Sequence, residues 1–180
     1  MFAFSLPADP PDPPATIAQT NLVALSRVSI SPLFESRSFT YRTAENTYEQ
    51  DPYAGFPTAP ERAVAEAIRA CLRRSSGFGR VVEPGSGLTP TLIAEVRVNE
   101  LYGDFRRGSR PRGTMEIHFI FYEVKDDAPG RIVLDKVCAR ETPLTGKTPA
   151  ALMAAWDADL REIMAEIASE YARANPKDGL

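Results

Sequence analysis

The alternation of apolar and polar side chains predicts a strand-rich centre for this chain. Thr91–Phe105 alternates with a period of two, and Thr114–Val124 repeats the pattern after a short loop. A period of two places every second side chain on one face of a strand. Arg131–Glu141 continues the pattern, so three neighbouring strands joined by short connections predict an antiparallel meander. The phase slips near Leu101–Gly103, where we expect a β-bulge.

Shorter extended segments precede this meander. Leu22–Ile30 is rich in aliphatic and β-branched residues and ends before Pro32, which is typical of a strand. Ser38–Thr43 alternates aromatic and polar residues, which indicates a half-exposed strand. Three further pieces are expected to be extended: Met1–Leu6, Thr47–Gln50 and Phe78–Val82.

Two segments follow the helical period instead. In Thr58–Ser75 the apolar residues recur every three or four positions, and Thr58 and Glu61 have the spacing of a capping box. The second helix runs from Thr148, its N-cap, to about Ala174. Each helix has one apolar face, so we expect both to pack on one side of the sheet. The predicted fold is therefore α+β: an antiparallel β-sheet with two α-helices packed on one face.

The length of 180 residues allows one domain with short extensions. We expect an N-terminal strand and proline-rich spacer over residues 1–20, a single α+β domain over 21–175 and a tail over 176–180. Five prolines fall within Pro7–Pro14, which favours a stiff polyproline II segment. This segment is either a plain linker or a ligand for a partner's groove.

Composition excludes several classes of protein. The net charge of −3 gives no field that gathers nucleic acid, and no apolar run has the length of a membrane span. One histidine and two cysteines are too few for most structural zinc sites, so we predict no metal and no cofactor. His118, on a predicted strand, has no nucleophile or orienting partner in sequence, so we predict no catalytic residue. No signal peptide follows Met1, which fits either a cytoplasmic chain or one whose export segment was removed.

The two cysteines leave two possibilities open. Cys71 lies on the apolar face of the first helix and Cys138 in the last strand, where buried free thiols are common. In an exported protein they could instead form a disulfide that closes a loop of roughly 66 residues, worth about 4 kcal/mol. Trp156 belongs to the apolar face of the second helix and is expected in the core.

Two clusters are candidate contact surfaces. Four aromatic rings gather near a chain reversal, where they form either a partner or oligomer surface or a satellite core. The loop Asp104–Gly113 carries four arginines against one aspartate, and is either a solvated hairpin tip or a contact for lipid headgroups or an acidic partner. The candidate contact residues are Phe39, Tyr41, Arg42, Tyr48 and Tyr53 in the first cluster and Arg106, Arg107, Arg110 and Arg112 in the second.

Short features also follow one another in a recognisable order. They are Phe2-Ala3-Phe4-Ser5-Leu6-Pro7, Val28–Phe34, Phe39–Arg42 with Tyr48 and Tyr53, Leu72–Phe78 with Val81-Val82, and Thr148-Pro149 with Ala155 and Leu160. Their order resembles the auxiliary lipoproteins of ABC-type transport systems, including the paraquat-inducible protein C type. The family's tryptophan near the start of the first helix is absent here, and Phe56 or Pro57 stands about there.

The resemblance implies a non-enzymatic periplasmic protein anchored to the inner leaflet of the outer membrane. Its partner would be a mammalian-cell-entry (MCE) protein of a lipid transport system. A ring of copies of this chain would dock the MCE conduit at the outer membrane. The acylated cysteine and signal peptide of the family would then lie upstream of Met1. A lipid or small-ligand carrier, with an apolar pocket between sheet and helices, is the alternative.

Overall fold

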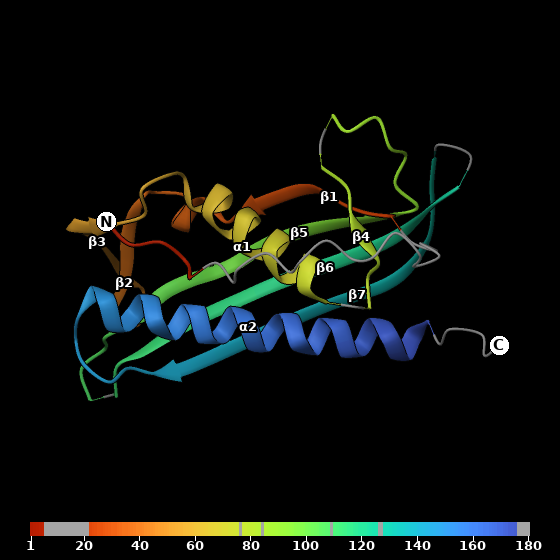
Figure 1. Ribbon diagram of the computed structural model, residues 1–180. Coiled ribbons are helices and arrows are strands. Elements are labelled where there is room, and N and C mark those ends of the chain that lie inside the picture. The colour runs from red at the N-terminus through yellow and green to blue at the C-terminus, as the bar shows by residue number, and fades with distance from the viewer. Residues whose placement is uncertain (6–21, 76, 84, 109, 126–127, 176–180) are drawn as a thin grey trace.

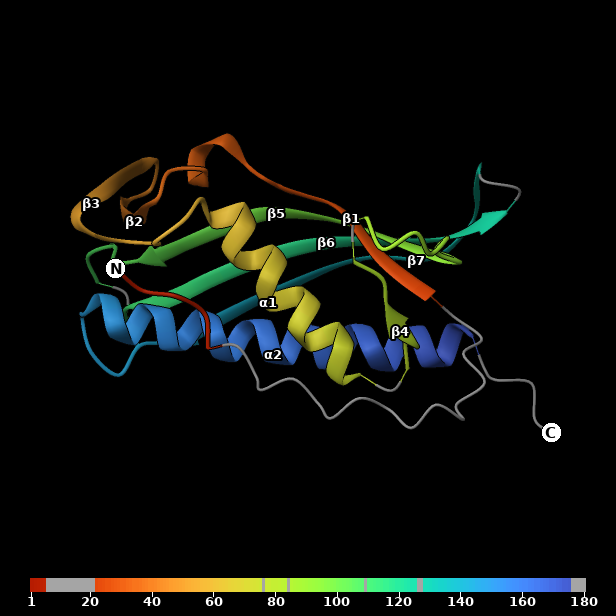
Figure 2. The same ribbon diagram turned by 45° about the horizontal axis from the view of Figure 1, so that its top comes forward.

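Two helices cover one face of a seven-stranded mixed sheet, and no described α-helix lies on the other, open face (Figures 1 and 2). The computed structural model describes residues 1–5, 22–75, 77–83, 85–108, 110–125 and 128–175. The proline-rich spacer at Pro7–Pro14 and the tail at 176–180 lie outside the described residues. The α+β class and the two helices on one face are confirmed.

The predicted antiparallel meander is confirmed. It consists of β5 (Leu92–Asp104), β6 (Arg112–Lys125) and β7 (Ala128–Pro143), paired in that order. The irregularity in β5 lies between Val98 and Glu100, earlier than expected. An extra residue there changes which face the following side chains occupy, because side chains alternate along a strand.

The first strand makes the sheet mixed. β1 (Leu22–Ile30) has the predicted bounds and runs parallel to β5, and β4 (Arg80–Val81) runs parallel to the start of β1. The antiparallel expectation therefore holds for the meander and fails for β1. The reason is the connection: the chain between β1 and β5 contains a helix, which is long enough for the crossover that parallel strands need.

A hairpin leads from β1 toward the first helix. After the 3-10 turn η1 (Pro32–Phe34), β2 (Ser38–Ala44) and β3 (Thr47–Gly55) pair antiparallel, and β2 also joins the end of β5. The prediction ended β3 at Gln50, but the strand continues through Asp51-Pro52. β3 is an edge strand, where a proline without an amide proton is tolerated.

The two helices differ in how they begin. α1 (Pro60–Arg74) starts after Ala59, whose side chain makes no capping hydrogen bond, so the predicted capping box of Thr58 is wrong. α2 (Pro149–Ala174) begins as predicted, because the amide of Ala151 donates to the Thr148 hydroxyl at 3.1 Å. None of the described helices is both long and apolar enough to cross a bilayer.

The core lies between the sheet and the helices. Trp156 on α2 is fully buried, as predicted, and its ring packs edge-on against Phe39 and stacks on Phe56. Its indole nitrogen donates to the carbonyl of Thr114 at 3.2 Å. Residues 1–5 form no strand, contrary to expectation; instead Phe2 and Phe4 extend this aromatic cluster.

Candidate docking surface

Two chain reversals that are far apart in sequence meet at one end of the sheet. One is the β2–β3 turn at residues 45–46, and the other is the β5–β6 loop at residues 105–111. Arg106 links them: it binds Asp104 through Nε and Nη2, and its Nη1 lies 3.1 Å from Glu45 Oε2. The Arg106 guanidinium also lowers the pKa of the buried Asp104 carboxyl. The two reversals are therefore braced against each other.

A second arginine closes the hairpin turn. Arg42 donates from Nε and Nη2 to the carbonyl of Glu45, and its guanidinium lies over the ring of Tyr48 at 5.9 Å. Tyr48 also packs edge-on against Tyr102 and Phe34, with ring centroids 5.6 and 6.1 Å apart. Of the four rings of the predicted aromatic cluster, only Tyr48 belongs to this smaller group, and its neighbours Phe34 and Tyr102 were not predicted.

Tyr41 holds the end of the hairpin in place. Its hydroxyl donates to Asp51 Oδ2 at 2.7 Å, while Asp51 Oδ1 accepts from the amides of Tyr53 and Ala54. Burial alone would raise the pKa of Asp51, but these three hydrogen bonds lower it. Burial and the adjacent carboxylate raise the pKa of Tyr41. This network holds the backbone of residues 51–54.

The four aromatic residues of the hairpin therefore have different environments. Phe39, expected at the surface, is 0% exposed and belongs to the core beside Trp156, so it contacts no partner in the folded state. Tyr41 and Tyr48 are partly buried by the contacts just described. Tyr53 alone projects fully, with 94% of its surface exposed.

The four arginines at the β5–β6 loop also have different environments. Arg112 pairs with Glu141 at 2.5 Å, and Arg106 is bound as described above. Arg107 and Arg110 are exposed, and among the described residues neither has an ion-pair partner. The free positive charge of the loop is thus about two, less than the sequence suggested. The exposed candidates are Tyr53, near the end of β3, and Arg107 and Arg110, in the β5–β6 loop, and we call these three residues the docking surface.

The remaining candidates lie elsewhere. His118 is half-exposed on the open face of the sheet, where its Nε2 lies 2.6 Å from Asp135 Oδ1. Cys71 and Cys138 are free thiols in the structure, and burial raises the pKa of Cys138 to about 11. Among the described residues, no group of three or more histidine, cysteine or carboxylate side chains is placed to hold a metal ion.

Sequence reasoning missed the residues that hold the docking surface in place. Asp51, Glu45 and Asp104 each bind a predicted candidate, and Tyr102 packs against another. The sequence did contain one signal. Asp51 precedes proline in a turn-like segment, where aspartate often accepts nearby backbone amides.

Solved structures define the class of fold. The chain superposes on the crystal structure of a protein from Xanthomonas campestris with a TM-score of 0.76 and 17% identity, covering 98% of this chain and 97% of that one. A hypothetical protein from Chlamydia trachomatis gives a TM-score of 0.52 and 13% identity, covering 83% of this chain and 99% of that one. Identities this low show the shared fold alone. Among curated proteins, none matches this chain.

The sequence itself defines the family. Residues 4–168 match the model of the ABC-type transport auxiliary lipoprotein component, and the chain belongs to that family. Membership confirms the resemblance found in the sequence. It makes the protein an auxiliary component of a transport system, and a lipoprotein family indicates a location in the cell envelope.

Proposed function

We propose that the protein is a non-enzymatic periplasmic lipoprotein that docks the conduit of an MCE-linked lipid transport system at the outer membrane. An acyl anchor would hold it at the inner leaflet of that membrane, and several copies would form a ring. The proposal starts from the family, whose members are auxiliary components of ABC-type transport. Beyond family membership, we propose the particular transport system, the membrane that holds the anchor and the assembly of several copies.

The observation that carries the docking role is the bracing of the docking surface. Arg106 links the loop that bears Arg107 and Arg110 to Asp104 and to Glu45 in the β2–β3 turn. The backbone amide of Tyr53 is held separately, by Asp51. Tyrosine and arginine are enriched in protein contacts, and Tyr53, Arg107 and Arg110 are all exposed. Preorganisation of such side chains lowers the entropy lost on binding.

A lipid carrier is less well supported. A carrier needs an enclosed apolar cavity, whereas the space between sheet and helices is filled by fully buried side chains such as Phe119, Phe121 and Ile163. Two pockets, of about 560 and 510 Å³, lie beside β1; both are open grooves lined mostly by polar side chains. These features favour a docking surface over a carrier pocket.

Two measurements test this function. Upstream of the codon for Met1, we expect a reading frame for an apolar segment followed by cysteine, and neighbouring frames for an ATPase, a permease and an MCE protein. A closed upstream frame would overturn the lipoprotein anchor. Native mass spectrometry of the purified protein should show no bound lipid, and one phospholipid per chain would support the carrier instead.

A further inference from the structure

β7 and β1, on opposite sides of the sheet, have different neighbours. Along β7, basic side chains are neutralised by α2: Lys136 pairs with Glu166 and Glu170, and Arg140 with Glu162 and Glu166. These contacts hold α2 over β7. Along β1, β4 pairs only with Leu22 and Val23, and no other described strand covers the remaining outer edge. Unpaired strand edges present free backbone amides and carbonyls.

The free part of this edge is short and regular. A bulge interrupts β1 between Leu25 and Arg27, and the amide of Ser31 donates to Val98 on β5. Since successive residues of a strand direct their backbone groups to opposite sides, Val28 and Ile30 direct theirs to the outer edge. Two residues with outward backbone groups suit an added strand of about three to five residues.

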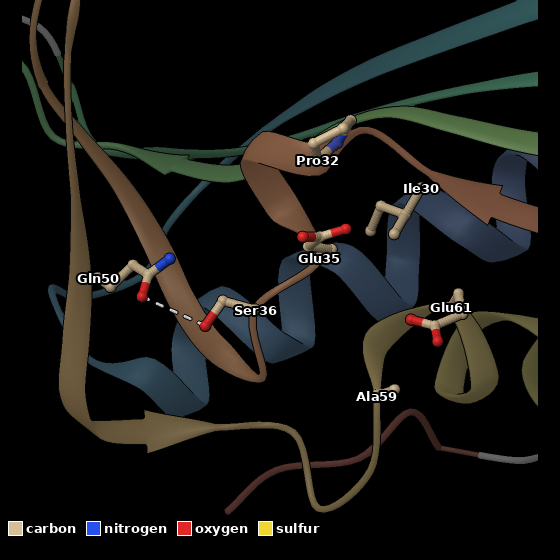
Figure 3. A pocket seen from close by; sticks show the side chains of 7 residues that line it. All are labelled: Ile30, Pro32, Glu35, Ser36, Gln50, Ala59 and Glu61. Carbon is tan, nitrogen blue, oxygen red and sulfur yellow. Dashed lines mark hydrogen bonds between the residues drawn. The ribbon is translucent and has the colours of Figure 1, made fainter.

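A groove runs beside this edge. One pocket, of about 510 Å³, lies between β1 and α1, with Leu25 and Val28 on the strand side. A second, of about 560 Å³, continues from Ile30 toward η1 and β3 (Figure 3). Glu61, in the first turn of α1, lines both pockets, so they adjoin beside β1, and we refer to them together as the groove.

The charge of the groove indicates what would fill it. Glu35 and Glu61 line the second pocket from opposite sides, and neither has an ion-pair partner among the described residues (Figure 3). By contrast, Glu66 in the first pocket is paired with Arg69 at 2.7 Å. The second pocket therefore carries a charge of about −2 that no described side chain neutralises.

We propose that this groove accepts an extended polypeptide segment of a transport partner. The segment adds as a strand to the outer edge of β1 beside Val28 and Ile30 and places a lysine or arginine between Glu35 and Glu61. Backbone hydrogen bonds supply affinity in this mode of recognition, and the side-chain pocket supplies specificity. This inference rests on the proposed function and adds one partner contact to it. The contact lies at a surface distinct from the docking surface.

A second copy of β1 fits the groove less well. The side chains of β1 on the helix-covered face are apolar: Val23, Leu25, Val28 and Ile30. Its one basic residue, Arg27, pairs in register with Glu95 and so lies on the open face. A copied β1 would thus bring no cation to Glu35 and Glu61, which is why we assign the groove to a different polypeptide.

The test uses a synthetic peptide of alternating threonine and valine with one central lysine, added to the isotope-labelled full chain and followed by NMR. We expect amide shifts at Val28, Ile30, Glu35 and Glu61. The Glu35→Gln/Glu61→Gln double variant should bind about two- to thirtyfold more weakly, since each of the two partly exposed ion pairs contributes about 0.2–1 kcal/mol. Glu123→Gln, at an exposed carboxylate on β6, is the matched control and should bind like the native protein.

The outcomes separate this inference from the proposed function. Equal binding to the double variant, or shifts that do not include Val28 and Ile30, would overturn the groove. Self-association that blocks the peptide would overturn it in favour of a second copy. Because the peptide assay requires no membrane or transporter, the groove can hold even if the neighbouring genes contradict the lipid-transport role, and the reverse is also true.

Discussion

Asp159 on α2 provides a sharp test of how the helix packs on the sheet. Its side chain is 0% exposed, and its Oδ1 accepts from the Thr142 hydroxyl at 2.5 Å, while Oδ2 has no hydrogen-bond partner among the described residues. Burial raises the pKa of Asp159 to about 6, against the lowering effect of the Thr142 hydrogen bond. At neutral pH the folded protein therefore holds an ionised carboxylate in surroundings that favour the neutral acid.

The sign of the pH dependence follows from this shift. Below pH ~4 the carboxyl is protonated in both the folded and unfolded chains, and it has no effect on stability. As the pH rises to about 6, the unfolded chain loses the proton first, so the free energy of unfolding falls. The full pKa difference corresponds to at most about 3 kcal/mol, and we expect an effect of about 1–3 kcal/mol.

The perturbation is Asp159→Asn, which keeps the size of the side chain and removes the charge. Urea unfolding at several pH values should show the variant about 1–3 kcal/mol more stable than the native protein at pH 7.5 and equal to it at pH ~3. Asp157→Asn on the same helix is the control, because Asp157 accepts from the Ser5 amide and its substitution should give no such pH-dependent gain. A gain independent of pH, or a loss at pH 7.5, would refute this reasoning.

Three further predictions concern other elements. Arg106→Ala should speed amide hydrogen exchange in the β2–β3 turn, because Glu45 and Asp104 lose their link; unchanged exchange would contradict the bracing. Thr148→Ala should lower the free energy of unfolding, measured with urea, by about 1 kcal/mol, because α2 loses its N-terminal cap. An unchanged free energy would show that the cap does not stabilise the helix. Cys138, whose pKa is raised to about 11 by burial, should resist alkylation at pH 8 until the protein is unfolded, and rapid native labelling would contradict its burial.

Hydrophobic patterning predicted the elements well because they depend on local residues. β1 has the expected bounds, since an aliphatic run ends before Pro32, and α2 begins at the expected cap. The pairing of β1 with β5 could not be predicted in the same way. A period of two tells which face of a strand is buried, but it does not tell which strand lies beside it or in which direction.

The candidate surface was only partly predictable for a related reason. Phe39 and Tyr53 belong to the same aromatic hairpin, yet one is in the core and the other is exposed. Their burial depends on how α2 covers the hairpin, which is a long-range contact. The partner of Arg106 was equally hidden, because Glu45 lies 61 residues away in sequence. Charge counting in the loop therefore overestimated its free positive charge.

The most direct test of the docking role is site-specific photo-crosslinking in the cell envelope. A photoreactive amino acid at Tyr53, on the docking surface, should form an adduct with a subunit of the transport system. The same amino acid at Val137, which is 51% exposed on the open face of the sheet, should not. Adducts of equal yield at both positions, or adducts only with lipid, would contradict the account.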